Sequence, residues 1–192
     1  MQNKTNNHSL YFIAIVPDEP ISSKITLLKK WMYEHYNSKG ALRSPPHITL
    51  HMPFKWKPEK EPLLEKSLSQ LSVISTSFEL KINKYGCFEP RVIYLNVEEN
   101  ESLSQLKKEV MGVSRKEWKL VPPKDERGFH PHITIGFRDL KKPLFYKAWE
   151  EVKNKTMTES FEVNALVLLK HNGKNWDEFK RFSFPINSAT AS

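Results

Sequence analysis

Histidine and threonine alternate in two short apolar stretches of this 192-residue chain. The first stretch, "PPHITLHMPF", contains His47 and Thr49, and the second, "FHPHITIGF", contains His132 and Thr134. Both stretches predict strands, in which side chains two residues apart point to the same face. Each strand would therefore direct an imidazole and a hydroxyl to one side, and its intervening apolar residues to a core.

Two imidazoles and two hydroxyls that face one cleft are suited to phosphoryl chemistry. One neutral histidine can take a proton from an attacking nucleophile while the other, protonated, gives one to the leaving oxygen. The reference pKa of histidine lies near neutrality, so both forms are accessible. The hydroxyls of Thr49 and Thr134 can donate hydrogen bonds to phosphate oxygens. His47 and His132 are thus the predicted acid–base pair, and the sequence leaves open which is the acid.

Residues that flank the two motifs are candidates for substrate contacts. His51 follows His47 by four residues and His130 precedes His132 by two, so strand alternation predicts all four imidazoles on one face. Such a face leaves a zinc-dependent alternative open, because imidazole is a good zinc ligand. Threonines occupy the inner positions and no carboxylate lies in either motif, so we predict no metal ligands here.

Aromatic and basic residues extend the candidate site. Phe129 could stack on a base or a ribose, and Arg138 shares the parity of His132 and could steer a phosphate. A basic rim around the motifs is predicted from Arg43, Lys55, Lys57, Lys124 and Arg127. The lysines of the predicted helices, Lys29, Lys30, Lys107 and Lys108, are interpreted as solvated surface.

Apolar periodicity predicts the elements that must position these residues. Strands are expected at 11–16, at the two motifs, and at 77–88, 91–97, 161–170 and 179–186; helices are expected at 21–36, 59–74, 101–113 and 144–155. The segment "TSFEL" at 76–80 recurs as "ESFEV" at 159–163, and His132 follows His47 by 85 residues (132 − 47). These matches predict two similar halves, about 10–90 and 91–187, each with a strand, a helix, a motif strand, a helix and a closing strand.

Composition bounds the class of protein. The formal charge of +8 and the pI near 9.4 favour an anionic partner such as nucleic acid or another phosphate-bearing molecule. Cys87 is the only cysteine, which excludes an intramolecular disulfide and a cysteine-rich zinc site. The apolar run at 11–16 is too short for a signal peptide or a membrane span. We expect a cytoplasmic protein with unstructured tails at 1–9 and 188–192.

The ordered pair "HITL" and "HITI", in a chain with duplicated halves, resembles the 2H (two-histidine) phosphoesterase superfamily, which includes 2'-5' RNA ligase-like proteins and RNA cyclic phosphodiesterases. The resemblance covers about residues 10–187. It implies catalytic roles for His47 and His132, and phosphate binding by Thr49 and Thr134. It also implies an α+β fold of two similar lobes of antiparallel sheet, flanked by helices around a central cleft with pseudo-two-fold symmetry, and activity without a metal or other cofactor.

Three functions from different classes are consistent with these patterns. The leading hypothesis is a metal-independent phosphoesterase that opens 2',3'-cyclic phosphate ends of RNA or small nucleotides to 2'-phosphates, with a 2'-5' RNA ligase activity as a further reaction. The alternatives are a binding module for RNA ends or nucleotides with little turnover, and a metal-dependent hydrolase that uses the histidine cluster. The expected partner is an RNA end or a small nucleotide, without membrane association, and the chain is expected to be a monomer.

Overall fold

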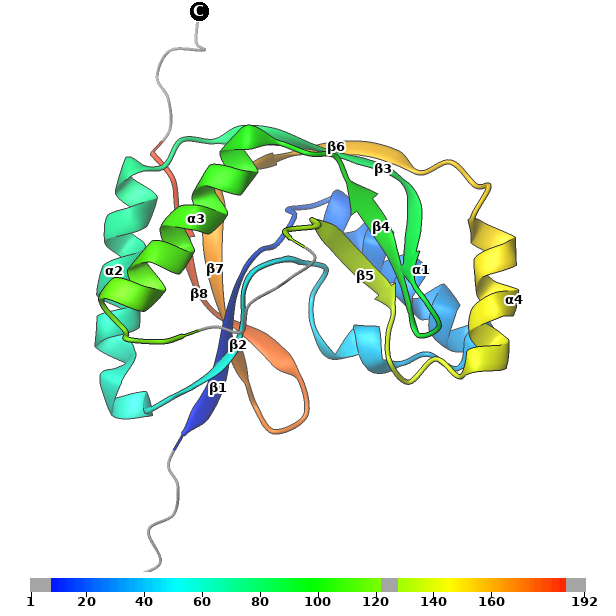
Figure 1. The fold of residues 1–192 in the computed structure, drawn as a ribbon, viewed down its shortest axis with the longest axis horizontal. Helices are drawn as coiled ribbons and strands as arrows, with labels where there is room; N and C mark the ends of the chain where they lie inside the picture. Colours follow the sequence, from blue (N-terminus) through cyan, green and yellow to red (C-terminus); the bar gives the residue numbers. More distant parts are fainter. Residues whose placement is uncertain (1–7, 122–127, 186–192) are drawn as a thin grey trace, which may run out of the picture.

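The computed structural model describes residues 8–121 and 128–185 of the chain (Figure 1). In this described part, two four-stranded antiparallel sheets are accompanied by four α-helices, which confirms the predicted α+β class. None of its helices has the length and apolar character needed to cross a bilayer. The predicted tails fall almost wholly outside the described residues, although the first strand already begins at Ser9.

The two sheets have the same plan. The first has the order β2–β1–β7–β8, and the second has the order β5–β4–β3–β6. In both sheets the motif strand lies at an edge, beside the strand that precedes it in the sequence. The strands are β1 (Ser9–Ile15), β2 (Ile48–Trp56), β3 (Phe78–Phe88), β4 (Val92–Val97), β5 (His132–Gly136), β6 (Thr158–Val163), β7 (Ala165–His171) and β8 (Trp176–Ser183).

Two of the helices pack on the sheet that does not contain their flanking strands. Each helix that follows β1 or β4 packs on the motif strand of the opposite sheet, so that α1 contacts β5 and α3 contacts β2. Figure 1 shows α2 and α3 together over the first sheet and α1 and α4 together beside the second. The helices are α1 (Ile21–Tyr36), α2 (Glu61–Ile74), α3 (Glu101–Lys116) and α4 (Lys142–Val152), with short 3-10 helices η1 (Gly40–Arg43) and η2 (Pro58–Lys60).

The predicted order of elements is confirmed, except that one predicted strand is divided into two. The recurring segments at 76–80 and 159–163 form β3 and β6, which are hydrogen-bonded neighbours in one sheet, with Leu80 opposite Phe161. The single strand predicted at 161–170 is in fact two strands from different sheets. Asn164 separates them, and its amide donates to Asp18 Oδ2 at 3.0 Å while its carbonyl accepts from the Phe184 N–H.

Strand β1 shows how the core and the site are separated. Tyr11, Ile13 and Ile15 point into the main core, beneath the helices. Phe12 and Ala14 point to the other face of the sheet, where they form a small buried cluster with Val167, Leu169 and Val16. Burial of side chains of this size contributes roughly 1.5–3 kcal/mol each. Alternate residues of β1 thus pack into the main core on one face of the sheet and line the opposite face with a small apolar cluster.

Candidate active site

The first motif lies on this second face of the first sheet. Strand register sets Thr49 opposite Ala14, so the threonine shares the face of Ala14 and Phe12. The ring of His47, just before β2, lies 4.8 Å from the ring of Phe12. Ile48 lies opposite Ile15 and is fully buried in the main core. The predicted separation of the motif into a polar face and an apolar face is therefore confirmed for these residues.

The second motif has the same arrangement in the other sheet. Thr134 lies opposite Tyr94, and His132 lies opposite Asn96, so the histidine and the threonine share one face of β5. Ile133 and Ile135 are fully buried. The Tyr94 ring lies 4.9 Å from the His132 ring, which is close to the 4.8 Å between the rings of Phe12 and His47. Neither motif threonine hydroxyl forms a hydrogen bond within the described part of the chain, so both remain available to a ligand.

Both motif histidines are held by the same backbone contact. His47 Nδ1 lies 2.8 Å from the carbonyl oxygen of Pro45, and His132 Nδ1 lies 2.8 Å from the carbonyl oxygen of His130. A carbonyl oxygen can only accept, so each Nδ1 carries the hydrogen that it donates. In a neutral imidazole this leaves Nε2 with its lone pair exposed, and protonation adds an N–H at Nε2. Each histidine therefore exchanges protons through Nε2.

The electrostatic surroundings hold His47 in its neutral form. Burial, with smaller contributions from the charges of Lys29 and His132, lowers the pKa of His47 to about 4. The hydrogen bond to Pro45 opposes these effects but is outweighed. The charge coupling between the two histidines indicates that their rings belong to one site. A neutral imidazole at physiological pH is the form that a general base requires.

Lys29 is a component of this site that the sequence analysis misassigned. The interpretation as solvated surface is wrong, because only 2% of the residue is exposed, and its Nζ donates to the carbonyl oxygen of Ser44 at 3.1 Å. Burial lowers the pKa of this amine to about 7. In the sequence, Lys29 stands four residues after Ile25 and three before Met32, on the apolar stripe of its helix. That position was the available signal, since a lysine on the buried face of a helix is rare.

His51 is not on the face of the two motif histidines, and the prediction of its position was wrong. The pairs Ala14–Thr49 and Ile13–His51 advance one residue on β1 and two on β2, so a bulge lies at Leu50. Such a bulge reverses the alternation beyond it. His51 is consequently only 2% exposed, with Nδ1 on the carbonyl oxygen of Met52 and Nε2 2.8 Å from Ser114 Oγ.

The other flanking candidates occupy different positions. His130 is exposed, and its Nε2 lies 3.0 Å from the Tyr94 hydroxyl while its carbonyl holds His132. Phe129 packs against the main core, with Lys107 Nζ 4.4 Å from its ring centroid. Arg138 is exposed beyond the end of β5, over the ring of Phe137. Among these candidates, His130 is thus the one that contacts the histidine pair directly.

The aromatic walls of the site could not be assigned from sequence. Around His47 the wall comprises Phe12, which contacts Trp176 at 4.7 Å between ring centroids. Around His132 it comprises Tyr94 and Phe88, whose rings lie 4.6 Å apart. A Cβ at Gly86 would approach the Tyr94 ring to 2.3 Å, so glycine leaves the space that this ring occupies.

A hydrogen-bonded joint ties the two motif strands together. After β5, Asp139 accepts hydrogen bonds from Ser38 Oγ at 3.1 Å and from the backbone N–H groups of Lys39 and Gly40 at 2.8 Å each. Ser38 Oγ also accepts from the Phe137 N–H at 3.1 Å. The segment at 38–40 leads through η1 to His47, so this joint links the approach to one histidine with the end of the strand that carries the other.

The predicted basic rim and the metal alternative can also be compared with the structure. Arg43, Lys55 and Lys57 are exposed, whereas Lys124 and Arg127 lie outside the described residues.

Within the ranges 8–121 and 128–185, no three histidine, cysteine or carboxylate side chains are grouped closely enough to hold a metal ion. The four-histidine face that motivated the metal alternative does not form, because His51 points into the core.

Comparison with known proteins identifies the family. The sequence profile described as the 2'-5' RNA ligase superfamily matches residues 17–175. A predicted phosphoesterase of Geobacillus sp. (strain WCH70) is 31% identical over 176 residues, which cover 90% of this chain and 94% of that protein. The chain belongs to the 2'-5' RNA ligase superfamily, a phosphoesterase-type enzyme family, which confirms the resemblance to the 2H phosphoesterases.

Solved structures show the same fold at low sequence identity. The crystal structure of TT0787 of Thermus thermophilus matches with a TM-score of 0.68 at 19% identity, over 91% of this chain and 97% of that one. Escherichia coli LigT, crystallised with 3'-AMP, matches with a TM-score of 0.65 at 21% identity, over 92% of this chain and 98% of LigT. These matches support the fold described above.

Proposed function

We propose that the protein is a metal-independent phosphoesterase that opens 2',3'-cyclic phosphates at RNA ends or on small nucleotides to 2'-phosphates. The observation that carries this proposal is the duplicated geometry of the site. Each motif presents an imidazole fixed through Nδ1, with a threonine hydroxyl two residues further along the same strand face. Membership of the 2'-5' RNA ligase superfamily supports it. So does the binding of 3'-AMP by the structural neighbour LigT, since that ligand is a nucleotide monophosphate.

His47 is the general base in this proposal. Its lowered pKa keeps Nε2 unprotonated at neutral pH, so Nε2 can take a proton from an attacking water. A bond forms between the water oxygen and phosphorus, and the bond from phosphorus to O3' breaks. His132, protonated at Nε2, donates that proton to O3'. The product has a 2'-phosphate and a free 3'-hydroxyl, and proton exchange with solvent restores both histidines.

The motif threonines bind the phosphate. Thr49 and Thr134 lie on the same strand faces as the two histidines, and their hydroxyls can donate to the two non-bridging oxygens. Negative charge on these oxygens is redistributed in the transition state, where fixed donors contribute most.

The same arrangement accommodates 2'-5' ligation. If the 5'-hydroxyl of a second RNA replaces water, the base removes the proton of that hydroxyl, and its oxygen attacks phosphorus. Cleavage of the bond to O3' then leaves a 2'-5' linkage. This second activity is favoured by the symmetry of the histidine pair, in which each imidazole can act as acid or base according to the direction of the reaction.

The test uses the purified full-length protein in EDTA, with nucleoside 2',3'-cyclic phosphates and a short RNA that ends in one. We expect conversion to 2'-phosphates, identified by mass and chromatography. His47→Gln and His132→Gln should each lower kcat by about 10²–10⁴-fold, because each removes one proton-transfer group. His35→Gln, which changes an exposed histidine of α1, is the matched control and should retain full activity.

Two results would contradict the proposal. Near-normal turnover in both motif variants would show that the histidine pair does not carry the chemistry. Tight binding of the RNA end without any product would instead establish the binding-module alternative.

A further inference from the structure

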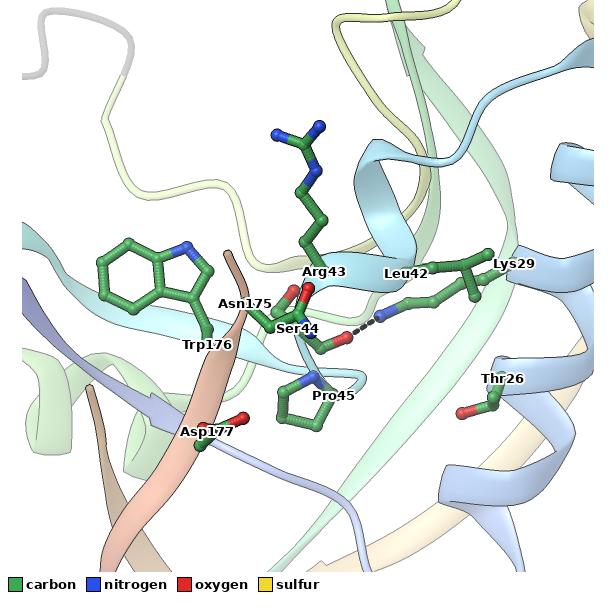
Figure 2. Close-up of a pocket in the computed structure, with 9 residues that line it drawn as sticks. All are labelled: Thr26, Lys29, Leu42, Arg43, Ser44, Pro45, Asn175, Trp176 and Asp177. Carbon is green, nitrogen blue, oxygen red and sulfur yellow. Dashed lines mark hydrogen bonds between the residues drawn. The ribbon is translucent and has the colours of Figure 1, made fainter. Parts of the chain in front are cut away.

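A pocket of about 270 Å³ lies beside the segment that leads into His47 (Figure 2). Three separate parts of the chain line it. Helix α1 contributes Thr26 and Lys29, the end of η1 and the two residues after it form the middle wall, and the residues at the start of β8 form the far wall. Figure 2 shows the Lys29 side chain reaching across to Ser44 from one side, with Trp176 on the other.

The pocket shares two of its walls with the histidine site. Pro45, which lines the pocket, supplies the carbonyl oxygen that holds His47 Nδ1. Trp176, also in the lining, packs edge-on against Phe12, and Phe12 packs against His47. A group bound in the pocket would therefore be next to a phosphate that reacts at His47.

The pocket offers positive charge for an anionic group. Lys29 is 2% exposed, and within the described ranges no carboxylate lies in ion-pair distance of its Nζ. The exposed guanidinium of Arg43 is likewise without an ion-pair partner among the described residues. The one carboxylate of the lining, Asp177, accepts a hydrogen bond from the Asn172 amide. Phosphate oxygens are natural partners for two such cationic groups.

The same pocket offers a surface and polar groups suited to a base. The indole of Trp176 is fixed by edge contacts with Phe12 and with His171, the latter at 4.9 Å between ring centroids, and it is partly exposed. Aromatic rings of this kind stack on unpaired bases. The side chains of Asn175 and Thr26 form no hydrogen bond within the described part of the chain. An amide that is not engaged elsewhere can pair with the polar edge of a base.

We propose that this pocket binds the penultimate nucleotide of an RNA substrate, which precedes the nucleotide that carries the cyclic phosphate. Its base lies against Trp176, and the phosphate that joins it to the terminal nucleotide lies near Lys29 and Arg43. Ligand pockets commonly enclose about 300–1,000 Å³, so this pocket of about 270 Å³ lies just below that range and suits a single nucleotide. The inference rests on the proposed function and narrows its substrate class, because the preferred substrates are RNA ends of at least two nucleotides.

The experiment compares kcat/KM for a dinucleotide that ends in a 2',3'-cyclic phosphate with kcat/KM for the mononucleoside cyclic phosphate. The full-length protein is expected to prefer the dinucleotide by about tenfold or more, the effect of one additional stacked base. Arg43→Gln and Asn175→Ala should each bring this ratio towards one. Lys174→Gln, which removes an exposed positive charge from the same β7–β8 turn outside the pocket, should leave the ratio unchanged.

A ratio near one in the unchanged protein would overturn the inference, as would a ratio that Arg43→Gln and Asn175→Ala leave intact. If neither substrate is converted, the proposed function fails, and the pocket is then judged by calorimetric binding of the corresponding dinucleotide and mononucleotide 2'-phosphates. Tighter binding of the dinucleotide that Arg43→Gln abolishes would support the pocket. Equal binding of both compounds would overturn it.

Discussion

Lys29 and His47 show how two ionisable side chains can influence one another without direct contact. The lysine amine donates to the carbonyl of Ser44, and the next residue along, Pro45, holds the imidazole. Both groups are buried enough that their charged forms are disfavoured, and their positive charges repel. Below pH 7 the lysine is mostly charged, and it then opposes protonation of His47 most strongly.

Replacement of Lys29 by methionine should therefore change the pH dependence of the reaction. Loss of the amine charge raises the pKa of His47 from about 4 toward its usual value, although burial still holds it low. A general base is lost when it is protonated, so the acid limb of kcat/KM should move to higher pH. Lys30→Met, which removes the adjacent exposed lysine, is the control. An acid limb at the same pH in both variants would show that Lys29 does not act on the base.

At the scale of single residues, the sequence predicted the position of a side chain well where a motif is repeated. It predicted the position poorly where a residue from another segment determines it. His47, Thr49, His132 and Thr134 could be predicted together because both motifs are short strands whose alternation the structure preserves. The apolar stripe of its helix already indicated that Lys29 is buried, but its hydrogen bond to Ser44, from another segment, could not be derived from local periodicity.

At the scale of elements, the joint around Asp139 determines how the two motif strands are placed. One carboxylate serves three donors, from Ser38, Lys39 and Gly40. Space is limited there as well, since a Cβ at Gly40 would lie 2.8 Å from Asp139 Oδ1. Ser38 is fully buried, so its hydroxyl has no access to water as a substitute partner. The spacing of the two strands therefore depends on an interaction between loops about 100 residues apart.

Replacement of Asp139 by alanine should lower both stability and turnover. Donors left without a partner cost about 1–3 kcal/mol when buried, so we expect a lower melting temperature. Because the approach to His47 is then held less firmly relative to β5, kcat should fall more than KM rises. Asp139→Asn retains one acceptor oxygen and should have an intermediate effect.

Glu150→Ala, which removes an exposed carboxylate of α4, is the control for the Asp139 variants. Thermal unfolding and steady-state kinetics of the three variants provide the measurement. A kcat for Asp139→Ala equal to that of the control would refute a positioning role for the joint.

Most elements were predictable from apolar periodicity, but their irregularities were not. The bulge at Leu50 turns His51 into the core, although simple alternation placed it with the two motif histidines. The break at Asn164 divides a run that reads as one strand. Both features arise from pairing with distant strands, which local sequence does not report.

At the scale of the whole molecule, the two halves of the sequence do not correspond to the two sheets. Strand β1 pairs with β2 and also with β7 from the far end of the chain, while β3 joins the sheet that contains β4, β5 and β6. Helices α1 and α3 each cover the sheet opposite to their flanking strands. The order of elements in each half was predictable, but this exchange was not, because similar halves can pair within themselves or with each other.

Separated halves should therefore fail to fold alone. A fragment of residues 1–90 lacks both partners of β3 and one of the two partners of β1. A fragment of residues 91–192 lacks the partner of β6 and one of the two partners of each of β4 and β7. Unpaired strands with apolar faces are poorly stable in water. We expect neither fragment to show a cooperative thermal transition by circular dichroism, and an equimolar mixture to recover one, with the intact chain as reference. A cooperative transition in either fragment by itself would contradict this.

The exchange of elements between halves brings both motifs into one chain, in which their surroundings can differ. If one half paired with a second copy of itself, the two histidines would be related by symmetry and would have identical neighbours. In a single chain that contains both halves, each motif can have its own neighbours. The lysines of α1 and α3 are an example. Lys29 is buried and bonded to Ser44, three residues before His47, whereas Lys107 lies over the ring of Phe129, three residues before His132. The two imidazoles thus lie in different surroundings, as the proposed assignment of one as the base and the other as the acid requires.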